Sequence, residues 1–112
     1  MIWVYDVSGS ITDTVIAQMY GEEKIAFEDL QPEKHIRIYA DAKVQKVEEF
    51  SPGDEITPPV SSGGGGTDFR PVFDWVESAG IQPDALVYLT DLYGSFPTQT
   101  PSYPVIWGST SH

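Results

Sequence analysis

Aspartate and hydroxyl side chains gather in three short stretches of this 112-residue chain. The first is Asp6-Val7-Ser8-Gly9-Ser10, which follows the apolar run Ile2-Trp3-Val4-Tyr5. The second is a glycine run that leads into Thr67, and the third is Asp91, which follows another apolar run. These stretches offer carboxylate and hydroxyl oxygens and no sulfur. That is the ligand set of a hard cation such as Mg²⁺, Mn²⁺ or Ca²⁺.

The candidate metal site combines two carboxylates and three hydroxyls: Asp6, Ser8, Ser10, Thr67 and Asp91. Hydroxyls are weak neutral ligands, so the carboxylates must supply the charge, in part through bound water. The glycines at 63–66 allow the backbone to pass close to a charged site without side-chain clash. An open octahedral site of this kind leaves room for one acidic group from another molecule.

The secondary structure expected from the sequence brings the three stretches together. Runs of β-branched and aromatic residues predict strands over 1–5, 35–40, 44–50, 84–90 and 105–107. Apolar residues three and four apart predict helices over 11–30 and 69–79, the second with Pro71 in its first turn. This order predicts an α/β fold, a mostly parallel sheet with one antiparallel edge strand and flanking helices. Such sheets bind ligands at the carboxyl ends of their strands.

Length and composition narrow the class of protein. The chain is expected to form a single domain over residues 1–112. The absence of cysteine excludes disulfides, thiolate zinc sites and a cysteine nucleophile. A formal net charge of −11 makes nucleic acid an unfavourable partner. No apolar stretch is long enough for a membrane helix and no signal peptide is recognisable, so we expect no membrane partner and a cytoplasmic location.

The spacing of these residues resembles the metal-ion-dependent adhesion site (MIDAS) of von Willebrand factor A (VWA) domains. That family has Asp-x-Ser-x-Ser after the first strand, a Thr on a later loop, and an Asp in a Thr-Asp-Gly after the fourth strand. Asp6, Ser8 and Ser10 match the first part, Thr67 the second and Asp91 the third. The chain is most similar to the bacterial and phage VWA-like domain that often follows a predicted metallopeptidase domain. Further segments carry this similarity: 39–44, 50–54, 65–73 and 88–97.

The resemblance implies a compact, VWA-like Rossmannoid fold and a protein-binding (adhesion or scaffold) module without catalysis. It also implies a partner that gives an acidic residue to the metal, and bacterial VWA proteins often work beside AAA-type ATPases. Two features depart from the family. Leu92 replaces the usual Gly after Asp91, and the chain is expected to be shortened at its C-terminal end, by a helix and a strand. No His-Glu-x-x-His motif is present, so the peptidase activity does not carry over.

Two other classes of function remain open. One is a metal-assisted phosphohydrolase, although Ser8 stands where a dehalogenase-type phosphatase has its second Asp, and the glycine run lacks the Lys of a P-loop. The other is an acidic decoy that occupies the basic surface of another protein, independently of metal. A serine hydrolase is unsupported, because neither His35 nor His112 is near the proposed site.

Several residues beside the site have simpler interpretations. Asp68 is expected to be a helix N-cap and not a ligand, and Arg70 to pair with it at the surface. Asp41 either orients a metal ligand or only makes the turn between two strands. Tyr93 and Phe96, on the loop after Asp91, are expected to contact a partner.

Overall fold

The computed structural model describes residues 1–7, 13–59, 66, 68–90 and 103–109. Five strands and two helices lie in these ranges: β1 (Ile2–Asp6), α1 (Asp13–Leu30), β2 (His35–Ala40), β3 (Val44–Phe50), α2 (Arg70–Ser78), β4 (Leu86–Thr90) and β5 (Val105–Ser109). The strands form one sheet in the order β3-β2-β1-β4-β5. Every neighbouring pair is parallel except β2 and β3, which are antiparallel. The predicted α/β fold, with its single antiparallel edge strand, is therefore confirmed.

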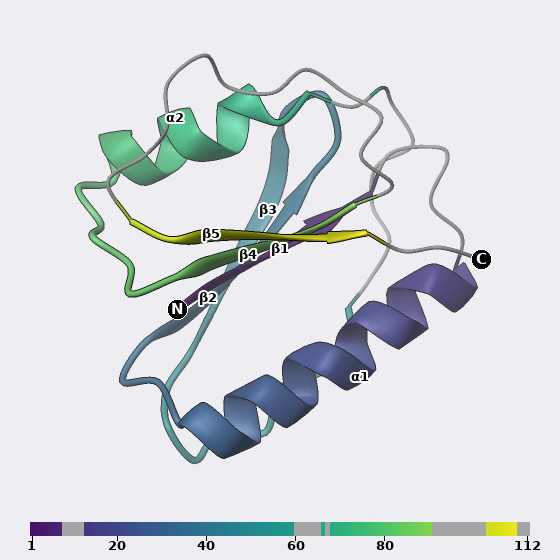
Figure 1. The fold of residues 1–112 in the computed structure, drawn as a ribbon, viewed down its shortest axis with the longest axis vertical. Helices are drawn as coiled ribbons and strands as arrows, with labels where there is room; N and C mark the ends of the chain where they lie inside the picture. Colours follow the sequence, from purple (N-terminus) through teal and green to yellow (C-terminus); the bar gives the residue numbers. More distant parts are fainter. Residues whose placement is uncertain (8–12, 60–65, 67, 91–102, 110–112) are drawn as a thin grey trace.

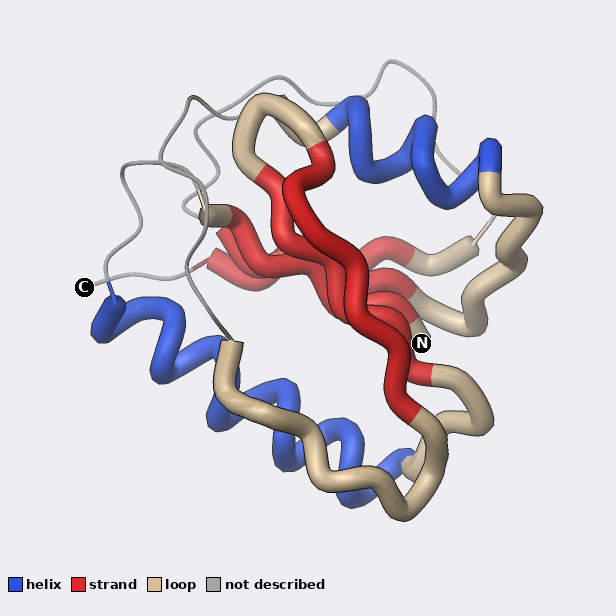
Figure 2. The backbone as a smooth tube through the Cα atoms, turned by 180° about the vertical axis from the view of Figure 1, so that it is seen from behind, coloured by secondary structure: helices blue, strands red, loops and turns tan. Residues whose placement is uncertain are grey.

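The two helices cover opposite faces of the sheet, so the domain has three layers (Figure 1). Helix α2 lies on one face, and the longer α1 runs beneath the other. The view from behind shows β3 as the near edge of the twisted sheet, with a helix on each side (Figure 2). Strand β1 is central, with β2 and β4 as its parallel neighbours. The carboxyl ends of these three strands consequently meet at one edge of the sheet.

Two cores form because successive side chains of a strand point to opposite faces. On β1, Ile2 and Val4 join the core beneath α2, whereas Trp3 and Tyr5 join the core above α1. All five residues of the strand are buried, as expected of a central parallel strand. This burial holds the end of β1, and with it Asp6, in a fixed place.

The helix ends show how local chemistry sets their limits. Helix α2 has Pro71 in its first turn, as predicted, and Gly80 just beyond its end at a φ of 69°. The prediction that Asp68 is its N-cap is wrong. Phe69 occupies the N-cap with a helical backbone and no side-chain cap, and Asp68, one residue earlier, accepts a hydrogen bond from the backbone N–H of Arg70 at 3.0 Å.

The predicted limits of the strands are close to those observed. Strands β2 and β3 match their predictions, β1 and β4 begin later than expected, and β5 continues to Ser109. The extension of β5 follows from its partner, because Leu89 and Thr90 of β4 pair with Gly108 and Ser109. Helix α1 begins at Asp13 among the described residues, and the expected start at residues 11 and 12 lies outside them.

Candidate metal centre

Asp6 is the one predicted metal ligand within the described residues, and it lies at the carboxyl end of β1. Its side chain is buried, with 1% of the residue exposed. On one side, Asp6 pairs in register with Ala40, the last residue of β2, and the next residue, Val7, donates its N–H to the Ala40 carbonyl at 2.8 Å. Asp6 is therefore fixed where ligands bind in parallel sheets.

The other four predicted ligands, Ser8, Ser10, Thr67 and Asp91, lie outside the described residues. The strands that lead to them are described. Strand β4 pairs with β1 up to Leu89 beside Tyr5, and it ends at Thr90, directly before Asp91. The expectation that Asp6 and Asp91 follow neighbouring strands thus agrees with the sheet order, while the position of Asp91 itself stays a prediction.

A backbone contact brings the segment after Thr67 to the same edge. The N–H of Asp68 donates to the carbonyl oxygen of Asp41 at 3.3 Å. Because Asp41 follows Ala40, the strand neighbour of Asp6, this contact joins the residue after the second sequence stretch to the end of β2. The backbone therefore carries the second and first stretches toward one another.

The side chain of Asp68 is occupied by Arg70, as expected. Asp68 Oδ1 accepts from Arg70 Nε at 2.9 Å, and Oδ2 accepts from the guanidinium NH2 at 2.7 Å. These hydrogen bonds and the guanidinium charge lower the pKa of Asp68, although burial acts in the opposite direction. Both oxygens of Asp68 already face a cation, so it is a poor candidate for a metal ligand.

The carboxylates of Asp6 and Asp68 both act on the buried hydroxyl of Tyr88, on β4. Burial raises the pKa of Tyr88, and the carboxylates of Asp6 and Asp68 raise it further. Two acidic groups from different stretches thus act on one buried hydroxyl at this edge. The candidate ligands predicted from the sequence are all oxygen donors, which fit a hard cation. Asp6 would hold such a cation directly or through water.

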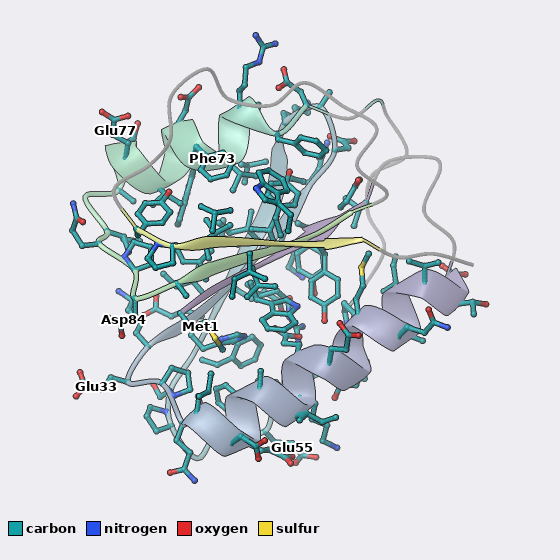
Figure 3. The ribbon with its side chains drawn as sticks, viewed as in Figure 1. Met1, Glu33, Glu55, Phe73, Glu77 and Asp84 are labelled. Carbon is teal, nitrogen blue, oxygen red and sulfur yellow. The ribbon has the colours of Figure 1, made fainter. Side chains whose placement is uncertain are left out.

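Three exposed acidic residues lie away from this edge. Glu33, Glu77 and Asp84 are exposed and lie at the end of the domain where Met1 begins β1 (Figure 3). They account for part of the net negative charge without contributing to the candidate centre. Within the described ranges, no group of three or more His, Asp or Glu side chains is arranged to hold a metal ion. The proposed centre depends on residues beyond those ranges.

A second polar cluster, which was not predicted from the sequence, is buried between α1 and the sheet. Glu23, in the middle of α1, accepts hydrogen bonds from Tyr5 OH at 2.7 Å, from Arg37 NH2 at 2.7 Å and from Arg37 Nε at 3.1 Å. His35 Nε2 lies 2.7 Å from Glu23 Oε2, the oxygen that also accepts from Arg37 Nε. Glu23, His35 and Arg37 are all fully buried.

The charges of this cluster stabilise one another. Burial alone would raise the pKa of Glu23, but hydrogen bonds from His35 and Arg37 and the charge of Arg37 outweigh it, so the pKa is lowered. An ionised Glu23 only accepts, so His35 carries its proton on Nε2. The pKa of Tyr5 is raised by its burial and by the adjacent Glu23. The cluster anchors α1 to β1 and β2, and no step of metal binding requires it.

A signal for Glu23 was present in the sequence. The buried positions of α1 are Val15, Ile16, Met19, Glu23 and Phe27, and the step from 19 to 23 to 27 follows one face of the helix. A charged residue on that face requires a buried partner of opposite charge. The sequence alone does not show that Arg37, on β2, is that partner.

The sheet order, the two covering helices and the acidic end of β1 define a VWA-like α/β domain. The family model described as VWA-like domain (DUF2201) matches residues 1–112. The chain belongs to this family, and the VWA part of the predicted resemblance is confirmed. No curated protein and no solved structure matches the chain at a significant level. In the described residues, neither helix is long and apolar enough to cross a membrane.

Proposed function

We propose that this domain is a divalent-cation-dependent protein-binding module with a MIDAS-type site and no catalytic activity. The metal, Mg²⁺ or alternatively Mn²⁺ or Ca²⁺, would be held by Asp6, Ser8, Ser10, Thr67 and Asp91. The observation that carries the proposal is the burial of Asp6 at the carboxyl end of β1, between two parallel neighbours, in a VWA-like domain.

The chemistry of the donor set supports a role in recruiting a partner. If the two carboxylates act partly through bound water, the three hydroxyls leave a divalent ion with little directly bound negative charge. A Glu or Asp side chain from another protein is the natural ligand for the remaining position. By family resemblance an AAA-type ATPase is a candidate for that protein. A cation that only ties three loops together would instead be enclosed by ligands of its own chain.

The test is capture of a protein partner from a bacterial lysate, with the domain immobilised in Mg²⁺ or in chelator. We expect capture by the wild type in Mg²⁺ and its loss in chelator and in Asp6→Ala. Replacing both Tyr93 and Phe96 with Ser should reduce capture while the metal Kd stays near that of the wild type. Capture that is unchanged by the chelator and falls steeply with salt would instead favour an acidic decoy that binds a basic surface.

A metal-assisted phosphohydrolase is the catalytic alternative. Incubation of the domain and Mg²⁺ with p-nitrophenyl phosphate distinguishes it from a binding module. For a non-catalytic module we expect the wild type and Asp6→Ala to release nitrophenolate equally, at the background rate. Release above background that requires both the metal and Asp6 would contradict a non-catalytic role.

A further inference from the structure

Asp41 occupies an unusual place for a turn residue. It follows the last residue of β2, and only 5% of it is exposed, although turn aspartates usually face water. Its Oδ1 atom accepts two hydrogen bonds, from the backbone N–H of Lys43 at 3.2 Å and from Gln45 Nε2 at 2.9 Å. The N–H of Asp41 also donates to the Lys43 carbonyl at 3.0 Å. Asp41 is therefore the centre of the turn between β2 and β3.

An irregularity in strand pairing explains the contact with Gln45. Tyr39 pairs with Lys46, but Ala40 pairs with Val44, so the register shifts and Gln45 has no partner on β2. The bulged backbone directs the amide of Gln45 to the carboxylate of Asp41. The side chain of Asp41 thus fixes the end of β2 at the point where the regular ladder breaks.

The backbone of Asp41 connects the segments that carry two predicted ligands. Its carbonyl oxygen accepts the N–H of Asp68, the residue after Thr67. On the other side, Ala40 pairs with Asp6 and accepts the N–H of Val7. A turn held firmly at Asp41 therefore sets the separation between the end of β1 and the segment that delivers Thr67.

We propose that Asp41 is a positioning residue for the candidate metal centre, an inference that rests on the proposed function. It does not bind the cation. It holds the β2–β3 turn so that the backbone of Asp68, the residue after Thr67, stays at the carboxyl end of β2. Groups that orient metal ligands in this way commonly change metal affinity by about 10- to 100-fold when they are removed.

The test is titration calorimetry of Mn²⁺ into metal-free wild type and variants. Asp41→Ala removes the acceptor, and we expect a Kd at least about tenfold weaker. Asp41→Asn keeps an Oδ1 atom that accepts both hydrogen bonds, so its Kd should return to within about threefold of the wild-type value. Gln45→Met removes the Nε2 donor to Asp41 from an exposed position, so this variant tests the same turn if Asp41→Ala does not fold. We expect Gln45→Met to bind Mn²⁺ more weakly than the wild type.

The matched control is Asp54→Ala. Asp54 Oδ2 accepts the backbone N–H of Ser51 at 2.7 Å in an exposed turn beyond the other end of β3. Its loss should leave the Mn²⁺ Kd unchanged. Amide exchange of the metal-free proteins gives a second measurement, and the Asp68 N–H should exchange faster in Asp41→Ala than in wild type or Asp54→Ala.

The outcomes separate the two proposals. A wild type that binds no Mn²⁺ would overturn the proposed function and this inference with it. A wild type that binds, with equal affinity in Asp41→Ala and in Gln45→Met, would overturn only the positioning role of Asp41. An equal loss of affinity in Asp41→Ala and Asp54→Ala would also overturn it, because the effect would then be general destabilisation.

Discussion

Replacing Glu23 with Met should leave a guanidinium buried without its main counter-ion. Glu23 receives two hydrogen bonds from Arg37 and has no exposed surface. Removing one partner of a buried ion pair typically costs about 3–5 kcal/mol of unfolding free energy. Arg37 keeps a second, longer contact, NH1 to Glu48 Oε1 at 3.4 Å, and Glu48 is partly exposed. Tyr5 and His35 would also lose the acceptor that Glu23 provides, so we expect a loss of about 3–5 kcal/mol.

Equilibrium unfolding in urea, followed by tryptophan fluorescence in metal-free buffer at neutral pH, measures this loss. The matched control is Glu22→Met, because Glu22 is its exposed neighbour on α1, and we expect a change within about 0.5 kcal/mol. The double variant Glu23→Met/Arg37→Met removes both charges and should be more stable than the sum of the single losses predicts. A Glu23→Met variant as stable as Glu22→Met, or strictly additive losses, would show that the buried ion pair does not stabilise the fold.

Three further predictions concern pH, helix propensity and the metal. Folding lowers the pKa of Glu23 below its unfolded value of about 4.3. Ionised Glu23 therefore stabilises the fold fully above that pH, and this stabilisation is lost as the pH falls through the folded pKa. In urea unfolding, the difference in unfolding free energy between wild type and Glu23→Met should be smaller at pH 3 than at pH 7. Gly21→Ala should raise the unfolding free energy by about 0.5–1 kcal/mol, because an added Cβ there meets nothing within 4 Å, whereas Gly53→Ala, at a φ of 84°, should lower it. Asp6→Ala should abolish Mg²⁺ binding in calorimetry yet be no less stable than wild type when both are metal-free, because repulsion between Asp6 and Asp91 is relieved; a marked loss of metal-free stability would assign Asp6 a structural role.

The sheet could be predicted from sequence because its strands are short apolar runs separated by clear breaks. The strands His35–Ala40 and Val44–Phe50 were predicted with the correct limits. Asp and Ala have weak strand propensity, so Asp41 and Ala42 mark the turn between the two strands. The end of β5 was missed because Gly108 and Ser109 have little strand propensity of their own. Pairing with β4 supplies what their sequence lacks.

Polar residues were harder to place, since their positions depend on partners distant in sequence. Glu23 is fully buried because Arg37, on another element, neutralises it. Asp is a residue type that often forms N-caps, but in this structure Phe69 is the N-cap of α2. The carboxylate of Asp68 instead accepts hydrogen bonds from Arg70. The type of a side chain limits which caps, ion pairs and hydrogen bonds it can form, and tertiary contacts decide which of them it does form.

Only part of the candidate metal centre predicted from the sequence lies within the described residues. The strand order accounts for the meeting of the ends of β1, β2 and β4, and the buried carboxylate of Asp6 lies where the spacing placed it. The oxygens of Ser8, Ser10, Thr67 and Asp91 lie outside the described residues, so their convergence is still a prediction from sequence spacing. Such ligands come from loops, whose geometry local patterns do not determine.

Calorimetric titration of Mg²⁺ into the chelator-treated domain shows whether a metal site exists at all. We expect one saturable site per chain and a thermal midpoint that rises with Mg²⁺ concentration, because a ligand of the folded state stabilises it. Asp6→Ala and Asp91→Ala should remove both effects. The absence of saturable heat in the wild type, together with a thermal midpoint independent of Mg²⁺, would contradict a metal-dependent function.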